Sequence, residues 1–147
     1  MANVHVNKRI VISLDLKDFF PSIHQDVIQK IMENQGIGTM PARTISEFCT
    51  YKYFVPQGAL TSPKISNIVT ATTFGPKLKE YCDSKGLILS VYADDITLSS
   101  ETTVNPDEVI AQVTAIVEEY GFRVNNQKTK VMSNAFRQYG MVLVGFW

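Results

Sequence analysis

Residues 87–99 read LILSVYADDITLS, two strand-like runs joined by a pair of acids. The runs Leu87–Ala93 and Ile96–Ser99 are rich in apolar and β-branched side chains, and only Asp94 and Asp95 separate them. This spacing is typical of a tight β-hairpin, in which a short turn connects antiparallel strands. We therefore expect a hairpin with two carboxylates at its tip.

A third strand is expected at Arg9–Leu16 (RIVISLDL), where apolar residues alternate with other residues. Because successive side chains of a strand point to opposite faces, Asp15 shares with Ser13 the face opposite the apolar one. By the same alternation, Asp94 shares a face with Tyr92, opposite the apolar residues of its own run. Both acids therefore belong to the more polar face of the expected sheet.

Helical patterns fill most of the remaining chain. The clearest has Asn105 as a cap and Pro106 in the first turn, with apolar residues at helical spacing as far as Tyr120. Further helices are expected from the Ser22–Gln25 capping box to Gly36, over Ala42–Tyr51, from Pro63 to the Gly75-Pro76 pair and over Lys77–Ser84, and short strands over Lys130–Met132 and Met141–Val144. This order predicts an α+β fold of the split β-α-β (ferredoxin-like) type, an antiparallel sheet with helices packed on one face.

Composition places the chain among ordinary folded domains. Its 147 residues suit one domain, 45% are hydrophobic, and 14 basic side chains balance 14 acidic ones. These values exclude a disordered chain, and the neutral net charge argues against a free-standing nucleic-acid binder, which usually has a basic excess. Cys49 and Cys82 lack metal-ligand spacing, so no zinc site is indicated. Because no apolar run is long enough to span a membrane, we expect a cytoplasmic location and no membrane partner.

The three acids form the candidate chemical site. In a split β-α-β sheet the first strand and the hairpin are neighbours, so Asp15, Asp94 and Asp95 converge at one end of the sheet. Two carboxylates about 4 Å apart repel by about 4 kcal/mol at an effective dielectric constant of about 20, so a cation is expected to bind there. Oxygen ligands of this kind suit Mg²⁺ or Mn²⁺. The alternative is that the acids are ordinary turn and strand-end residues.

Five sequence blocks give this acidic cluster a context. They are Asp15–Ile23 (DLKDFFPSI), Pro56–Asn67 (PQGALTSPKISN), Tyr92–Asp95 (YADD), Gly121–Lys130 (GFRVNNQKTK) and Gln138–Gly145. In this order they resemble the palm region of the bacterial reverse transcriptases, retron-like or group II intron-like, over nearly the whole chain. The wording PQGALTSP resembles the retron-type enzymes more than the group II intron maturases.

The resemblance implies a metal-binding role for the acids. Asp15 and Asp94 match the aspartates that hold two Mg²⁺ ions, for which Mn²⁺ can substitute. Asp95 completes the acidic cluster, and the backbone carbonyl of Leu16 matches a further metal ligand. In such a site one ion lowers the pKa of the primer 3′-hydroxyl and the other neutralises the departing pyrophosphate.

The resemblance also implies substrate contacts. Gln57 and Gly58 match a loop that lies against the incoming nucleotide, and Phe20 matches the bulky residue that blocks a ribose 2′-hydroxyl. Each has an alternative from the residues alone, because Phe20 also suits a plain core position and Gln57-Gly58 also suits a turn.

Two further matches lie near the C-terminus. Lys128 matches a lysine that gives a proton to pyrophosphate, and Lys130 is its competitor for that role. The segment 142–146 (VLVGF), with Val144 and Gly145, matches the hairpin that grips the primer.

Taken whole, the resemblance implies an RNA-directed DNA polymerase that extends a DNA primer with dNTPs on an RNA template. Residues 1–147 would be its palm domain, with fingers upstream and a thumb downstream outside this chain. We expect no polymerisation by the chain alone, because a neutral palm attracts phosphates weakly. The alternative function is a polymerase-derived, noncatalytic nucleic-acid-binding or scaffold domain. A base-stacking RNA-binding module of the same fold is disfavoured, since acids occupy its stacking positions.

Overall fold

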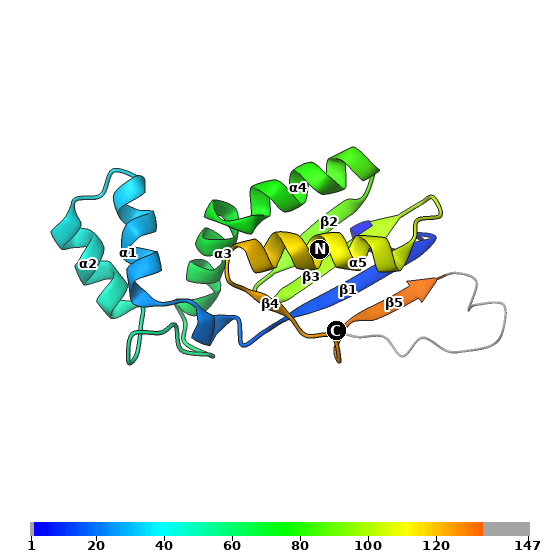
Figure 1. The fold of residues 1–147 in the computed structure, drawn as a ribbon. Helices are drawn as coiled ribbons and strands as arrows, with labels where there is room; N and C mark the ends of the chain where they lie inside the picture. The colour runs from blue at the N-terminus through cyan, green and yellow to red at the C-terminus, as the bar shows by residue number, and fades with distance from the viewer. Residues whose placement is uncertain (1, 134–147) are drawn as a thin grey trace.

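The computed structural model describes residues 2–133, and Figure 1 shows a sheet with helices across one face. In this part of the chain the strands pair antiparallel in the order β2-β3-β1-β4, and β5 also pairs with β1. The strands are β1 (Ile10–Lys17), β2 (Ile88–Tyr92), β3 (Asp95–Ser100), β4 (Arg123–Val124) and β5 (Lys130–Ser133). The helices are α1 (Gln25–Asn34), α2 (Thr39–Phe48), α3 (Ser62–Thr72), α4 (Phe74–Lys85) and α5 (Pro106–Glu119), with 3-10 turns η1 (Ala2–His5) and η2 (Phe20–Ser22). The predicted α+β fold is confirmed, while the strand predicted at 141–144 lies outside the described residues.

The central strand β1 carries the middle of the core. It pairs with β3 along one edge and with β4 and β5 along the other. Its inward side chains are Ile10, Ile12, Leu14 and Leu16, all buried as the alternation predicts. Ile12 and Leu14 pair with Leu98 and Ile96 of β3, which are fully buried on the same face.

Helices α4 and α5 cover the apolar face of the sheet (Figure 1). On α5 the predicted stripe Val109, Val113, Ile116 and Val117 is buried. The predicted cap is also confirmed, because the side chain of Asn105 accepts a hydrogen bond from the backbone N–H of Asp107 at 3.0 Å. Tyr120, predicted to face inward, instead caps the helix end with an exposed side chain. Within residues 2–133 no helix is long and apolar enough to cross a membrane.

Helices α1 and α2 form a pair beyond one end of the sheet, next to α3 (Figure 1). The predicted cap of α1 was wrong: the cap is His24, whose Nδ1 accepts from the backbone N–H of Asp26 at 3.2 Å. Ser22 belongs to η2 and donates its hydroxyl to the carbonyl of Asp18 at 2.6 Å. Helix α2 also begins and ends three residues before the predicted Ala42–Tyr51.

The predicted split into two helices is present, but it lies earlier than predicted: α3 ends at Thr72, and α4 begins at Phe74, before the Gly75-Pro76 pair. A Cβ atom at Gly75 would stand 2.5 Å from the carbonyl oxygen of Thr70. Only glycine therefore permits this close approach of the two helices, because a backbone oxygen cannot turn aside as a side chain can.

His5 attaches the 3-10 turn η1 to the face of the sheet opposite α4 and α5. The two nitrogens of the His5 ring each form a hydrogen bond of 2.7 Å, one with the Ser99 hydroxyl on β3 and one with the Ser90 hydroxyl on β2. In the folded protein burial, followed by the charges of Lys8 and the N-terminus, lowers the pKa of His5 below its usual 6.5.

This lowered pKa predicts a pH-dependent stability. The unfolded chain takes up a proton on His5 at higher pH than the folded chain does, so the contribution of neutral His5 is fully present above about 6.5 and is lost as the pH falls through the folded pKa. Urea denaturation at pH 7.5 and 5.5 measures this loss. We expect the parent to lose more unfolding free energy between the two pH values than His5→Gln does. An equal loss in both proteins would contradict the assignment.

Candidate active site

Asp15 and Asp95 stand directly opposite each other on neighbouring strands. The antiparallel register of β1 and β3 ends with the pair Asp15 and Asp95, and Asp95 also pairs with Tyr92 on β2. Directly opposite residues of two strands point to the same face, with Cβ atoms about 4.5–5.5 Å apart. Since Leu14 and Ile96 are in the core, both carboxylates belong to the face that the helices leave uncovered.

The hairpin turn lies one residue earlier than predicted. Ala93 and Asp94 form the turn, whereas Asp95 is the first residue of β3. Ala93 adopts a left-handed backbone conformation with φ of 52°, as such two-residue turns require. The carbonyl of Asp94 accepts a hydrogen bond from the backbone N–H of the buried Leu16 at 2.8 Å. All three predicted aspartates are thus gathered at one end of the sheet.

The proximity of the acids shows in the ionisation of Asp95. Partial burial, followed by the negative charges of Asp94 and Asp15, raises the pKa of Asp95 above its usual value. The ammonium group of Lys128 acts in the opposite direction on the same pKa. Both neighbouring acids therefore lie close enough to affect the ionisation of Asp95.

Lys128 contacts the largely sheltered side chain of Asp15. Its Nζ lies 3.3 Å from Oδ2 of Asp15, and the Asp15 side chain is only 14% exposed while that of Lys128 is 63% exposed. The Lys128 ammonium group therefore reaches Asp15, as expected if Lys128 belongs to the site. Lys130 lies in β5 opposite Ser13, two residues further back along β1.

Asn125 is a site residue that the sequence analysis missed. Its backbone N–H donates to the carbonyl of Asp15 at 2.7 Å, and its Nδ2 lies 3.4 Å from Oδ1 of the same residue. Its side-chain oxygen accepts from the backbone N–H of Gln127 at 3.2 Å, and its carbonyl accepts from the backbone N–H groups of Lys128 and Thr129. The available signal was an asparagine before a polar run, which favours such a turn.

The other predicted site residues lie in η2, in the loop before α3 and near the C-terminus. Phe20 is half-buried, and its ring meets that of the buried Phe19 edge-on at 5.6 Å. Gln57 and Gly58 are exposed in the loop before α3, where Gly58 has a positive φ of 85°. The predicted primer-grip residues Val144 and Gly145 lie outside the described part of the chain.

The oxygen chemistry of the cluster fits a hard divalent cation. Among residues 2–133 no three acidic, histidine or cysteine side chains are gathered closely enough to form a complete metal site by themselves. Magnesium nevertheless needs only one or two carboxylates, because water and substrate phosphates complete its coordination. The facing carboxylates of Asp15 and Asp95, whose mutual repulsion a cation would relieve, meet that requirement.

Two solved structures have a similar fold. A telomerase from Candida tropicalis, solved without its C-terminal domain, superposes with a TM-score of 0.63 over 90% of this chain and 32% of that one. A telomerase from Candida albicans, in complex with a fragment of telomeric RNA, gives 0.64 over 89% of this chain and 28% of that one. Both are 14% identical to this chain, which shows a shared fold alone.

Sequence comparison adds nearer relatives. The chain is 30% identical over 128 residues to the retron Ec86 reverse transcriptase of Escherichia coli and 32% identical over 145 residues to the retron Mx65 reverse transcriptase of Myxococcus xanthus. These alignments cover 87% and 86% of this chain but only 40% and 34% of those proteins. A family model described as reverse transcriptase (RNA-dependent DNA polymerase) matches residues 1–143. The chain therefore belongs to the reverse transcriptase family.

Proposed function

We propose that this chain is the palm of a retron-like RNA-directed DNA polymerase, which extends a DNA primer with dNTPs on an RNA template. The observation that carries the proposal is the facing pair Asp15 and Asp95, with Asp94 in the adjoining turn, in a chain of this family. The relatives named reverse transcriptases support the reaction, and their retron names support the subfamily. As the chain spans well under half of those relatives, we assign the complete reaction to the full-length protein.

The acids would hold two divalent cations, Mg²⁺ with Mn²⁺ able to substitute. Asp15 and Asp94 are the proposed shared ligands, with Asp95 and the Leu16 carbonyl beside them. Bound there, the cations would activate the primer 3′-hydroxyl and neutralise the pyrophosphate charge. Lys128, whose exposed ammonium already reaches the cluster, is the proposed proton donor to pyrophosphate.

The loop before α3 and the η2 turn would form the nucleotide side of the site. Gln57 and Gly58 are exposed and lie outside the helices and strands, so they can lie against an incoming base or sugar. Phe20 follows β1 closely and is supported from behind by Phe19, which packs on Phe74 and Phe122. A ring held in this way could exclude a ribose 2′-hydroxyl.

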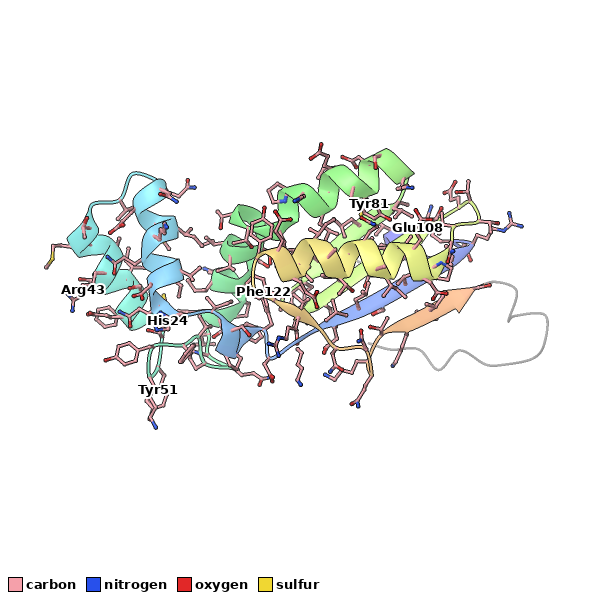
Figure 2. All side chains as sticks on the ribbon, viewed as in Figure 1. His24, Arg43, Tyr51, Tyr81, Glu108 and Phe122 are labelled. Carbon is pink, nitrogen blue, oxygen red and sulfur yellow. The ribbon has the colours of Figure 1, made fainter. Side chains whose placement is uncertain are left out.

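An aromatic turn next to α1 is the proposed contact for the single-stranded template. Tyr51 and Phe54 close a tight hairpin with two backbone hydrogen bonds, and Lys52 and Tyr53 both have positive φ values, 48° and 69°. Non-glycine residues in this strained conformation concentrate at functional sites. The turn displays Tyr51 and Tyr53, 68% and 66% exposed, and Figure 2 shows Tyr51 pointing away from the molecule. The His24 ring stacks on that of Tyr53 at 6.1 Å.

Bases stack on such aromatic surfaces without sequence preference. The neighbouring surface is hollowed by a cleft of about 530 Å³ between α1 and α2, lined in part by Tyr53 and Arg43. Figure 2 places Arg43 on the same side of the molecule as His24 and Tyr51. This surface supports a nucleic-acid partner despite the neutral net charge of the chain.

Substitution of the turn aspartate tests the catalytic proposal. In the full-length protein, Asp94→Asn should abolish Mg²⁺-dependent primer extension, because one charged ligand is lost. Asp83→Asn is the matched control, since Asp83 lies on α4 paired with Lys79 and should leave extension unchanged. Extension that survives Asp94→Asn would favour the noncatalytic binding or scaffold function.

Substitution of Phe20 tests the sugar gate. Phe20→Ala should let the full-length protein incorporate ribonucleotides while deoxynucleotide incorporation persists, because a clash is removed and no bond is lost. Phe19→Ala is the comparison, and it should mainly lower stability, by about 3–5 kcal/mol for a buried ring. Unchanged sugar discrimination together with a similar stability loss in Phe20→Ala would assign Phe20 to the core.

Removal of one tyrosine side chain from the aromatic turn tests the template contact. Tyr53→Ala should weaken binding of a single-stranded RNA oligonucleotide by about 1–3 kcal/mol, the usual value of one stacked base. Tyr120→Ala, which removes another exposed tyrosine at the end of α5, should leave binding unchanged. Fluorescence anisotropy measures both affinities. Equal affinity of the two variants would move the template contact away from this turn.

A further inference from the structure

The Asp15 carboxylate is held by two groups from the chain segment after β4. Asn125 Nδ2 lies 3.4 Å from one carboxylate oxygen, and Lys128 Nζ lies 3.3 Å from the other. This sheltered carboxylate faces a second one, that of Asp95, so a positive group close to it offsets their mutual repulsion. Lys128 supplies that positive charge directly.

The backbone beneath Lys128 is fixed, whereas its side chain can move. The carbonyl of Asn125 accepts hydrogen bonds of 3.1 Å from the backbone N–H groups of Lys128 and Thr129, and Asn125 itself is tied to the backbone of Asp15. The Lys128 side chain is 63% exposed, so its four-carbon stem can swing toward solvent without disturbing the core. The ammonium group is therefore placed at Asp15 by the turn but is not locked there.

A divalent cation and this ammonium group would compete for the same carboxylate. Both are positive, both approach the uncovered face of the sheet, and their mutual repulsion grows steeply as they come close. The lysine is the group that can leave the carboxylate, because water can solvate its exposed ammonium group.

We propose that Lys128 is a built-in counter-ion of the Asp15 and Asp95 pair, and that a divalent cation displaces its ammonium group from Asp15 on binding. This inference rests on the proposed metal site and adds a step to it. The displaced amine remains on the same turn, beside the site, where the proposed proton donor is needed. Asn125 acts as the positioning residue that keeps the turn against Asp15 in both states.

Manganese titration of the chain tests the displacement. The free Mn²⁺ signal in electron paramagnetic resonance reports binding without any need for polymerisation. Lys128→Gln should tighten the Mn²⁺ dissociation constant about three- to ten-fold, since a competing positive charge is removed. Lys79→Gln is the matched control, because it removes the same charge from an exposed lysine that pairs with Asp83 on α4, and should change the constant less than about two-fold. Lys128→Arg, which keeps the charge, should stay close to the parent.

The outcomes separate this inference from the proposed function. If the parent binds Mn²⁺ and Asp15→Asn removes that binding, the metal site stands. An unchanged or weaker affinity of Lys128→Gln would then overturn the counter-ion role alone. If Asp15→Asn leaves the parent's binding unchanged, or no binding occurs, both the metal site and the displacement are refuted. Circular dichroism of each variant verifies that the fold is intact.

Discussion

The antiparallel pairing of β1 with β3 is the constraint on which the candidate site depends. Its register runs from Ile10 opposite Ser100 to Asp15 opposite Asp95. Because side chains alternate between faces, a shift of one residue would turn Leu14 outward and Asp15 into the core. The register that buries the apolar residues of both strands is therefore the same one that brings the two carboxylates together. Core packing holds the acids in place against their own repulsion.

This arrangement explains how like charges can persist at one end of a stable sheet. The cost of the pair appears in the raised pKa of Asp95, which burial and the two neighbouring acids cause. Opposing contributions come from the Lys128 ammonium group at Asp15 and from the apolar packing of α5 across the other face of β1. The turn that begins at Asn125 and carries Lys128 is hydrogen-bonded to the backbone of Asp15. The acids and their counter-ion are thus positioned by one strand.

The parts of this structure that the sequence predicts best are those with strong periodicity. Three patterns each fit only one type of element: the alternation in β1, the two runs of the hairpin and the helical stripe of α5. All three elements are present in the structure. Capping patterns predict the start of a helix less well. Ser22 and His24 both offer a side-chain acceptor before α1, and His24 is the cap because Ser22 belongs to η2. The two-residue strand β4 carries no periodicity at all, so it could not be found from the sequence.

The candidate site also contains residues that the sequence predicts and one that it does not. Pattern and resemblance predicted the aspartates and Lys128 as site residues but gave no sign of Asn125, whose contacts to Asp15 span 110 positions of sequence. Nothing local in an asparagine reveals a partner so distant. Its role follows only from the way β1 and the segment after β4 lie together in the sheet.

The one-residue displacement of the hairpin turn gives Asp94 and Asp95 different physical settings. Asp95 lies in a strand ladder between Tyr92 and Asp15, so its Cβ direction is fixed by two pairings. Asp94 lies in the turn, where its carbonyl accepts a hydrogen bond from the backbone N–H of Leu16 on β1. In the proposed metal site, Asp95 would therefore be a ligand whose direction the sheet fixes, and Asp94 a ligand whose direction the turn sets. The position of the turn alone thus gives these two adjacent acids different backbone settings.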